Sequence, residues 1–155
     1  MWQVTARRAR AADVAQIAAL VNDFAAEDVM LPRTPEQVAL ALDDYVVATD
    51  AHGRVLACGA LREYSPSLAE LVSLAVAREA HGQGLGRLVV AEVERLAAKR
   101  GFTSIFAHTL APRFFEAVGY TAVDRALYPE KCARPHTTCL RRVLGAECGS
   151  LAEAA

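Results

Sequence analysis

The sequence predicts a mixed α/β domain, with a central sheet flanked by helices. Short apolar runs typical of strands alternate along the chain with segments whose apolar residues recur at helical spacing. Residues 70–109 follow the order strand, glycine turn, helix and strand, which implies a right-handed parallel crossover. The chain of 155 residues is also long enough to bury a core without disulfides or metals.

Each element has a local reason in the sequence. Thr34 and Pro35 provide an N-cap and a first helical residue, and Gly101 is placed to end the helix after the glycine turn. Turn-forming residues at 50–53 join two apolar runs and predict a hairpin. The expected strands are 2–6, 45–49, 54–63, 69–76, 104–109, 121–124 and 136–143, and the expected helices are 14–24, 35–42, 85–100 and 112–118.

The glycine turn, His81-Gly82-Gln83-Gly84-Leu85-Gly86-Arg87, is the strongest functional signal. Alternate glycines let the backbone approach a ligand closely, and the unpaired N–H groups of a following helix favour an anion such as a diphosphate. The segment lacks the Gly-Lys-Ser/Thr ending of a nucleotide P-loop. Its spacing also differs from the G-x-G-x-x-G of a dinucleotide-binding turn.

Composition excludes several classes of partner and site. The net charge of −1 gives no basis for binding nucleic acid or an anionic membrane. The short basic group Arg7, Arg8 and Arg10 is expected to be solvated surface. The N-terminus carries no secretory pattern and no apolar run is long enough to span a bilayer, so a cytoplasmic location is expected. The four cysteines form no C-x-x-C pair, and the group around Cys132 and His136 lacks an evident fourth ligand, so no metal is expected.

The glycine turn resembles motif A of the GNAT superfamily of acyl-CoA N-acyltransferases, whose pattern Q/R-x-x-G-x-G/A falls on residues 81–86. A histidine, His81, stands where the family usually has Arg or Gln. The segments 69–76 and 114–120 resemble the family's fourth strand and its F-Y-x-x-x-G-F segment. The resemblance implies a mostly antiparallel sheet whose fourth and fifth strands splay apart, in a domain over residues 1–144 with a frayed tail at 145–155.

The same resemblance implies that acetyl-CoA is the acetyl donor. Its pantetheine arm would follow the fourth strand and its diphosphate would lie on the glycine turn. The residues implied in this binding are Leu74, Ala75, Val76, His81, Gly82, Gln83, Gly84, Leu85, Gly86, Arg87, Thr109 and Phe114.

The chemistry implied is attack of an amine on the acetyl thioester, which requires an amine that has lost its proton. Glu70 occupies the position at which some GNAT enzymes place a glutamate base, although a lone carboxylate at a strand start is usually exposed. Phe115 stands where many relatives have the tyrosine that protonates the leaving thiolate. Tyr120, Tyr128 or water are the alternatives for that step.

A narrower resemblance concerns the acceptor. Four segments together look like the acetyltransferase domain of N-acetylglutamate synthases and the stand-alone amino-acid N-acetyltransferases: residues 30–34, 59–62, 69–76 and 114–120. In those enzymes two basic residues hold the substrate's carboxylates, and Arg33 and Arg62 match their positions. Lys131 and Thr137 fall where the family closes the substrate pocket.

The resulting expectation is an enzyme that acetylates the α-amino group of an amino acid, L-glutamate above all, in arginine biosynthesis. Two alternatives remain at this point: another small-amine acetyltransferase of the same fold, and a non-catalytic module that senses acetyl-CoA. Homodimers are common in the family, and the resemblance implies one here.

Overall fold

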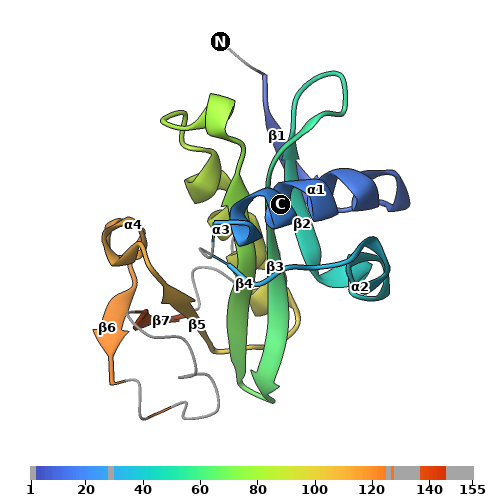
Figure 1. Cartoon of the computed structure of the whole chain (residues 1–155). Helices are drawn as coiled ribbons and strands as arrows, with labels where there is room; N and C mark the ends of the chain where they lie inside the picture. Colours follow the sequence, from blue (N-terminus) through green and yellow to red (C-terminus); the bar gives the residue numbers. More distant parts are fainter. Residues whose placement is uncertain (1–2, 28–29, 125–126, 128–136, 146–155) are drawn as a thin grey trace. The chain divides into compact units, whose positions relative to one another are not determined.

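The computed structural model confirms the α/β class and describes residues 3–27, 30–124, 127 and 137–145. Seven strands form one mostly antiparallel sheet in the hydrogen-bonded order β1-β2-β3-β4-β5-β7-β6, with β4 parallel to β5. The elements, labelled in Figure 1, are β1 (Thr5–Arg8), η1 (Ala11–Asp13), α1 (Val14–Ala25), α2 (Pro35–Leu40), η2 (Leu42–Asp44), β2 (Tyr45–Thr49), β3 (Val55–Ser65), β4 (Leu68–Val76), η3 (Arg78–Ala80), α3 (Leu85–Lys99), β5 (Ser104–Thr109), α4 (Pro112–Ala117), β6 (Thr121–Val123) and β7 (Thr138–Val143).

The chain divides into two compact units. The first comprises Met1–Arg62 and Leu71–Leu96, and the second comprises Glu63–Glu70 and Ala97–Ala155. The predicted elements correspond closely to the observed ones. The first strand is the largest departure, because it occupies Thr5–Arg8 rather than 2–6. Its register explains the shift, since Thr5 pairs with Thr49, the last residue of β2, and Arg8 pairs with Val46, the second residue of β2.

In the first unit, helices cover both faces of the sheet (Figure 1). One face packs against α1 and α2 in a core cluster to which β3 contributes Cys58. The next residue, Gly59, faces α3, where an added Cβ would come within 2.8 Å of a Val89 methyl carbon. Successive strand residues point to opposite faces, so Gly59 permits the close approach of α3.

Local signals set the edges of this unit as predicted. Thr34 accepts the Gln37 N–H, and the Gln37 side chain accepts the Thr34 N–H, which makes a complete capping box for α2. In the β2–β3 hairpin, the Asp50 carboxylate accepts two backbone N–H groups, and Gly53 adopts a left-handed φ of 80°. Asx geometry with glycine is a strong hairpin signal.

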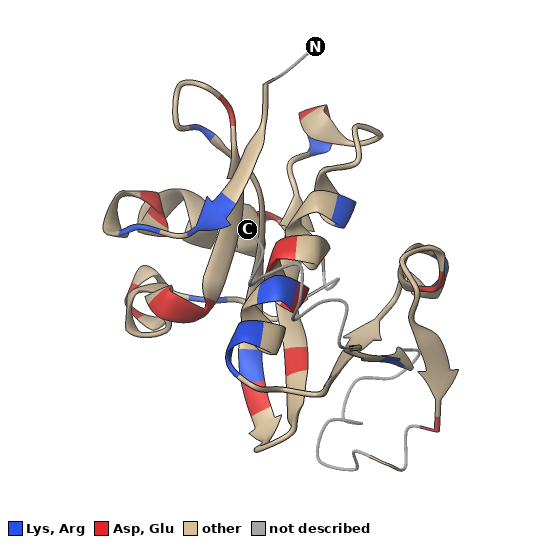
Figure 2. Cartoon of the chain, turned by 180° about the vertical axis from the view of Figure 1, so that it is seen from behind, with Lys and Arg blue, Asp and Glu red and all other residues tan. Residues whose placement is uncertain are grey.

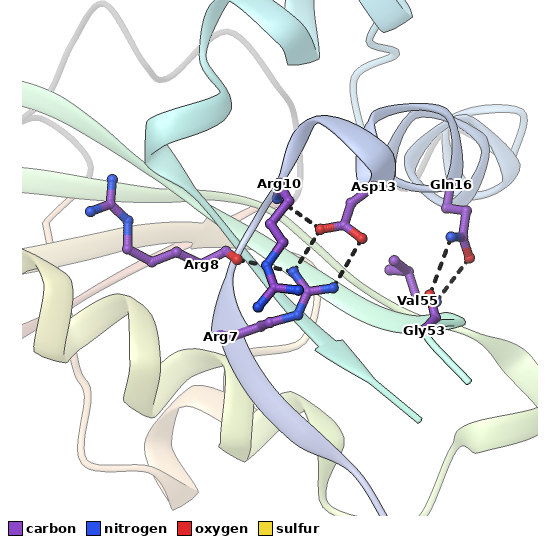
Figure 3. A network of polar contacts seen from close by, with 7 residues as sticks. All are labelled: Arg7, Arg8, Arg10, Asp13, Gln16, Gly53 and Val55. Carbon is purple, nitrogen blue, oxygen red and sulfur yellow. Dashed lines mark hydrogen bonds and ion pairs between the residues drawn. The ribbon is translucent and has the colours of Figure 1, made fainter. Parts of the chain in front are cut away.

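A polar network fixes the start of α1 (Figure 3). Arg7 donates two hydrogen bonds to the Asp13 carboxylate, at 2.7 and 3.1 Å, and the Arg10 N–H donates a third at 2.8 Å. Burial by itself raises the pKa of Asp13, but these bonds outweigh it, so the pKa lies below its ordinary value. The expectation that Arg7 is solvated surface is wrong, because its guanidinium pairs with a carboxylate only 4% exposed.

The second unit packs around the parallel ladder of β4 and β5. That ladder joins Leu68 to Ser104, Ala69 to Ile105 and Glu70 to Phe106, and then ends. A ladder of three pairs agrees with the predicted splay of these strands. Phe106 and Cys139 belong to the buried core of this unit, and the Tyr64 ring packs edge-on against Phe106 at 5.3 Å.

Charged residues of both signs are interspersed along the elements, in keeping with the near-zero net charge (Figure 2). No helix in the described ranges has the length and apolar character needed to cross a bilayer. Within the same ranges, no three His, Cys, Asp or Glu side chains gather as metal ligands would. Cys132 and His136 lie outside the described residues.

We expect Asp13→Asn to lower the free energy of unfolding at pH 7 by about 2 kcal/mol, because the Arg7 guanidinium loses a charged acceptor and faces an amide NH2 group in its place. A carboxyl with a depressed pKa stabilises the fold above its unfolded pKa, and this contribution is lost as the pH falls through the folded value. The deficit of Asp13→Asn should therefore shrink below about pH 4. Urea unfolding at pH 7 and pH 3 measures both effects.

The control is Arg8→Ala, which removes an exposed pair with Asp43. It should cost less than about 1 kcal/mol. An Asp13→Asn deficit no larger than this, or one that grows at low pH, would contradict the assignment.

Candidate active site

The glycine turn of the first unit has the geometry of an anion cradle. Gly82 and Gly84 adopt left-handed φ values of 81° and 78°, and a Cβ added at either would meet nothing within 4 Å. The Leu88 N–H donates to the Gly84 carbonyl at 3.2 Å, so the amides of residues 84–87 come before the first N–H that is bonded within the helix. Open space beside these amides, at the positive end of a helix dipole, fits a diphosphate.

His81 anchors this turn through its side chain. Its Nε2–H donates to the Val76 carbonyl at 2.8 Å, and this partner fixes the tautomer because a carbonyl only accepts. The ring also stacks on Phe24 of α1, with centroids 6.3 Å apart. The histidine at the family's Arg/Gln position thus ties the turn to the end of β4. A contact of residue 81 with the cofactor stays a prediction for its backbone.

Arg78, three residues before His81, also joins this segment to α1. Its guanidinium carbon lies 4.7 Å from the centroid of the Phe24 ring, and its nitrogens pair with Asp23 and Glu27. Each exposed ion pair contributes little alone, whereas the stacked ring and two carboxylates together define one position for the segment. The segment that leads into the glycine turn is therefore held by the side chains of both Arg78 and His81.

Strand β4 changes direction just before the predicted pantetheine residues. Ser73 has a φ of 56°, and it is the one non-glycine residue with a positive φ in the described part of the chain. The Cys58 thiol donates to its carbonyl at 3.4 Å, and burial raises the pKa of this thiol to about 12, so it keeps its proton. A left-handed residue within a strand re-aims the following backbone groups, here those of residues 74–76.

Glu70 lies in the second unit, at the last pair of the β4–β5 ladder. It is only 6% exposed, in contrast to the usual exposure of a carboxylate at a strand start. Burying a carboxylate costs free energy unless the group has a partner or a function, so this burial makes Glu70 a candidate functional residue.

The remaining predicted residues of the second unit differ in accessibility. The Thr109 hydroxyl accepts the Ala111 N–H at 2.9 Å, which fixes the start of α4. Phe114 is half-buried, while Tyr120 is buried with its ring 5.2 Å from that of Phe115. Thr137 is buried as well. Lys131 and Tyr128 lie outside the described residues.

Arg33 and Arg62 both belong to the first unit, which also carries the glycine turn. Arg33 is half-buried and donates to the Pro32 carbonyl at 2.8 Å, while Arg62 is exposed on β3. Neither guanidinium forms an ion pair with any residue that the structure describes, although Arg7, Arg54 and Arg78 do. Both cations are thus available to an anionic ligand.

Comparison with known proteins identifies the class. The model of the acetyltransferase (GNAT) family matches residues 14–120. An uncharacterized N-acetyltransferase of Chlorobaculum tepidum is 36% identical over 137 residues, which are 88% of each chain. An amino-acid acetyltransferase of Mycobacterium tuberculosis is 30% identical over 120 residues, covering 76% of this chain and 68% of that protein.

Solved structures share the fold. A Mycobacterium tuberculosis protein in complex with CoA superposes with a TM-score of 0.81 at 24% identity, over 91% of this chain and 99% of that one. An N-acetylglutamate synthase from Neisseria gonorrhoeae, complexed with coenzyme A and N-acetyl-glutamate, superposes with a TM-score of 0.83 at 22% identity. The match covers 94% of this chain and 36% of that one.

The fold and these matches define an acetyltransferase. The chain belongs to the GNAT family, whose enzymes use acetyl-CoA as the acetyl donor.

Two features of the site were not predicted from the sequence. The His81 contact with Val76 lies within a motif that was analysed only for its backbone. The left-handed Ser73 had no signal at all, because glycine, asparagine and aspartate are the residues that normally mark such a conformation.

We expect Gly84→Ala to raise the KM for acetyl-CoA about tenfold or more, because a Cβ at this φ both strains the turn and enters the cradle. The matched control is Gly53→Ala, at a φ of 80° with the same open surroundings in the β2–β3 hairpin. Both variants should lose similar unfolding free energy. Equal KM values for acetyl-CoA in the two variants would refute the assignment of the cradle.

Proposed function

We propose that this chain transfers the acetyl group of acetyl-CoA to the α-amino group of an acidic amino acid, L-glutamate in the first place. The observation that carries the proposal is the pair Arg33 and Arg62, two guanidinium groups without carboxylate partners among the described residues of the unit that holds the glycine turn. The amino-acid acetyltransferase of Mycobacterium tuberculosis, at 30% identity, supports an amino acid as the acceptor.

In this proposal the donor lies along β4 and the glycine turn. The amides of residues 82–87 hold the diphosphate, and the exposed Arg87 adds positive charge beside them. The pantetheine arm follows the backbone of Leu74, Ala75 and Val76, which comes after the left-handed Ser73. Thr109 and Phe114 of the second unit complete the predicted set of donor-binding residues.

The acceptor is held by its carboxylates. A guanidinium binds a carboxylate through two parallel hydrogen bonds, which fixes orientation as well as charge. An α-amino dicarboxylate offers two such groups, one for Arg33 and one for Arg62. Thr137 and Lys131 are the further residues proposed to close the acceptor site.

The reaction removes two protons from the amine nitrogen and returns one to the thiolate. The ammonium loses its first proton to Glu70, directly or through water, and the free amine then attacks the thioester carbonyl. The new C–N bond forms as the C–S bond breaks, the thiolate of CoA leaves, and the nitrogen gives its second proton to water. A β4 backbone N–H stabilises the charge that develops on the carbonyl oxygen. We assign Tyr120 as the acid that protonates the thiolate, with Tyr128 or water in its place as the alternatives.

Release of free CoA with a panel of amines tests the proposal. We expect turnover with L-glutamate to exceed turnover with L-glutamine, the neutral analogue, and with simple amines. Arg33→Ala and Arg62→Ala should each raise the KM for L-glutamate about 10- to 100-fold, because a charge-assisted pair is lost, and leave that for acetyl-CoA nearly unchanged.

Arg95→Ala, which removes an exposed arginine that pairs with Glu92 of α3, is the control for both variants. Arg33→Lys should lie between Arg33→Ala and wild type, since lysine keeps the charge but not the fork. An unchanged L-glutamate KM in both alanine variants rejects the clamp. Tight acetyl-CoA binding without turnover on any amine would indicate the sensor.

The base has its own test. Glu70→Gln should lower kcat about 100-fold near neutral pH, with recovery at high pH, where the free amine forms without a base. The pH profile of kcat distinguishes this from a folding defect, and the exposed Glu63→Gln is the control. A wild-type profile in Glu70→Gln would remove Glu70 from the mechanism.

A further inference from the structure

Asn22, on the third turn of α1, forms an amide clamp on the backbone of Arg33. Its Oδ1 accepts the Arg33 N–H at 2.8 Å, and its Nδ2 donates to the Arg33 carbonyl at 2.6 Å. The two bonds satisfy both main-chain polar groups of Arg33 with one side chain. The complementary partners also assign the orientation of the amide.

The residues on either side of Arg33 are held in place as well. Thr34, the next residue, caps this helix through its reciprocal bonds with Gln37. On the other side, the Arg33 guanidinium donates to the Pro32 carbonyl. The backbone of Arg33 is therefore held from α1 and followed directly by a helix cap, so the direction in which its side chain leaves the chain is fixed.

We propose that Asn22 is a positioning residue for the acceptor. It contacts no substrate itself, and it acts by holding the backbone of Arg33 so that the guanidinium is oriented before a carboxylate arrives. The inference rests on the function proposed above. Ordering a loop residue costs free energy, and a site that has already ordered it binds its ligand more tightly.

The chemistry of the clamp is specific to a short primary amide. Aspartate in its place would still accept the Arg33 N–H but would set a carboxylate oxygen against the Arg33 carbonyl, since it has no donor. Alanine would leave both main-chain groups to water. Serine keeps a single hydroxyl that donates or accepts.

The chain offers a matched control in Gln16, six residues earlier on α1. Its amide holds the β2–β3 hairpin in the same manner, accepting the Val55 N–H at 2.9 Å and donating to the Gly53 carbonyl at 3.4 Å (Figure 3). The contacts of Gln16 are confined to the turn at 53–55, which carries no residue of the proposed acceptor site. Gln16→Ala thus removes a comparable clamp without touching Arg33.

In the full chain, Asn22→Ala should raise the KM for L-glutamate about tenfold, with the KM for acetyl-CoA within about twofold of wild type. Gln16→Ala should leave both values near wild type while lowering the unfolding midpoint similarly. Asn22→Asp should resemble Asn22→Ala. If Asn22→Ala does not fold, Asn22→Ser is judged by the same KM criterion.

A double-mutant cycle separates positioning from general stability. Because Asn22 acts through Arg33, adding Asn22→Ala to Arg33→Ala should change the L-glutamate KM less than twofold further. A full additional tenfold rise in that background overturns the inference, as does an Asn22→Ala KM equal to that of Gln16→Ala while Arg33→Ala shows its loss. Arg33→Ala without any effect on the KM rejects the proposed clamp itself, which is a distinguishable result.

Discussion

The left-handed Gly82 and Gly84 let the chain turn from η3 into α3 within a few residues, and this turn is the constraint on which the proposed site depends. It exposes the first amides of α3 beside open space. Two side chains that precede the glycines hold it in place. His81 bonds to the Val76 carbonyl, and Arg78 packs on Phe24 of α1. The glycine turn is therefore part of the packing of the first unit rather than a free loop.

Side-chain clamps on backbone groups recur through the same unit and explain how its edges are ordered. The Asp13 side chain accepts the Arg10 N–H just before α1, Gln16 accepts the Val55 N–H in the β2–β3 hairpin, and Asn22 accepts the Arg33 N–H. All three belong to a single turn-and-helix segment. The apolar face of α1 packs into the core, while its polar residues reach the neighbouring loops. One helix thus combines a stabilising role with a role in the proposed acceptor site.

Much of the fold was predictable, because strong local signals agreed with tertiary structure. The Thr34-Pro35 cap, the turn at 50–53, and the strand, glycine turn, helix and strand of residues 70–109 all formed as expected. The first strand was misplaced because pairing with β2, rather than local apolarity, sets its ends. The left-handed backbone at Gly82 and Gly84 was predictable from the glycine spacing. Three features were not predictable: the burial of Glu70, the pairing of Arg7 and the clamp by Asn22. Each depends on contacts between residues that are separated in sequence and brought together by the fold.

The most direct test of the central claim is an amide-resolved NMR titration of the protein with CoA. The account predicts that the largest shift changes fall on the backbone amides of residues 82–87, and that pantetheine, which lacks the diphosphate, leaves most of them unmoved. Saturable binding of CoA with these amides unperturbed, or equal perturbation by pantetheine, would contradict the claim that the turn between β4 and α3 is the seat of the diphosphate.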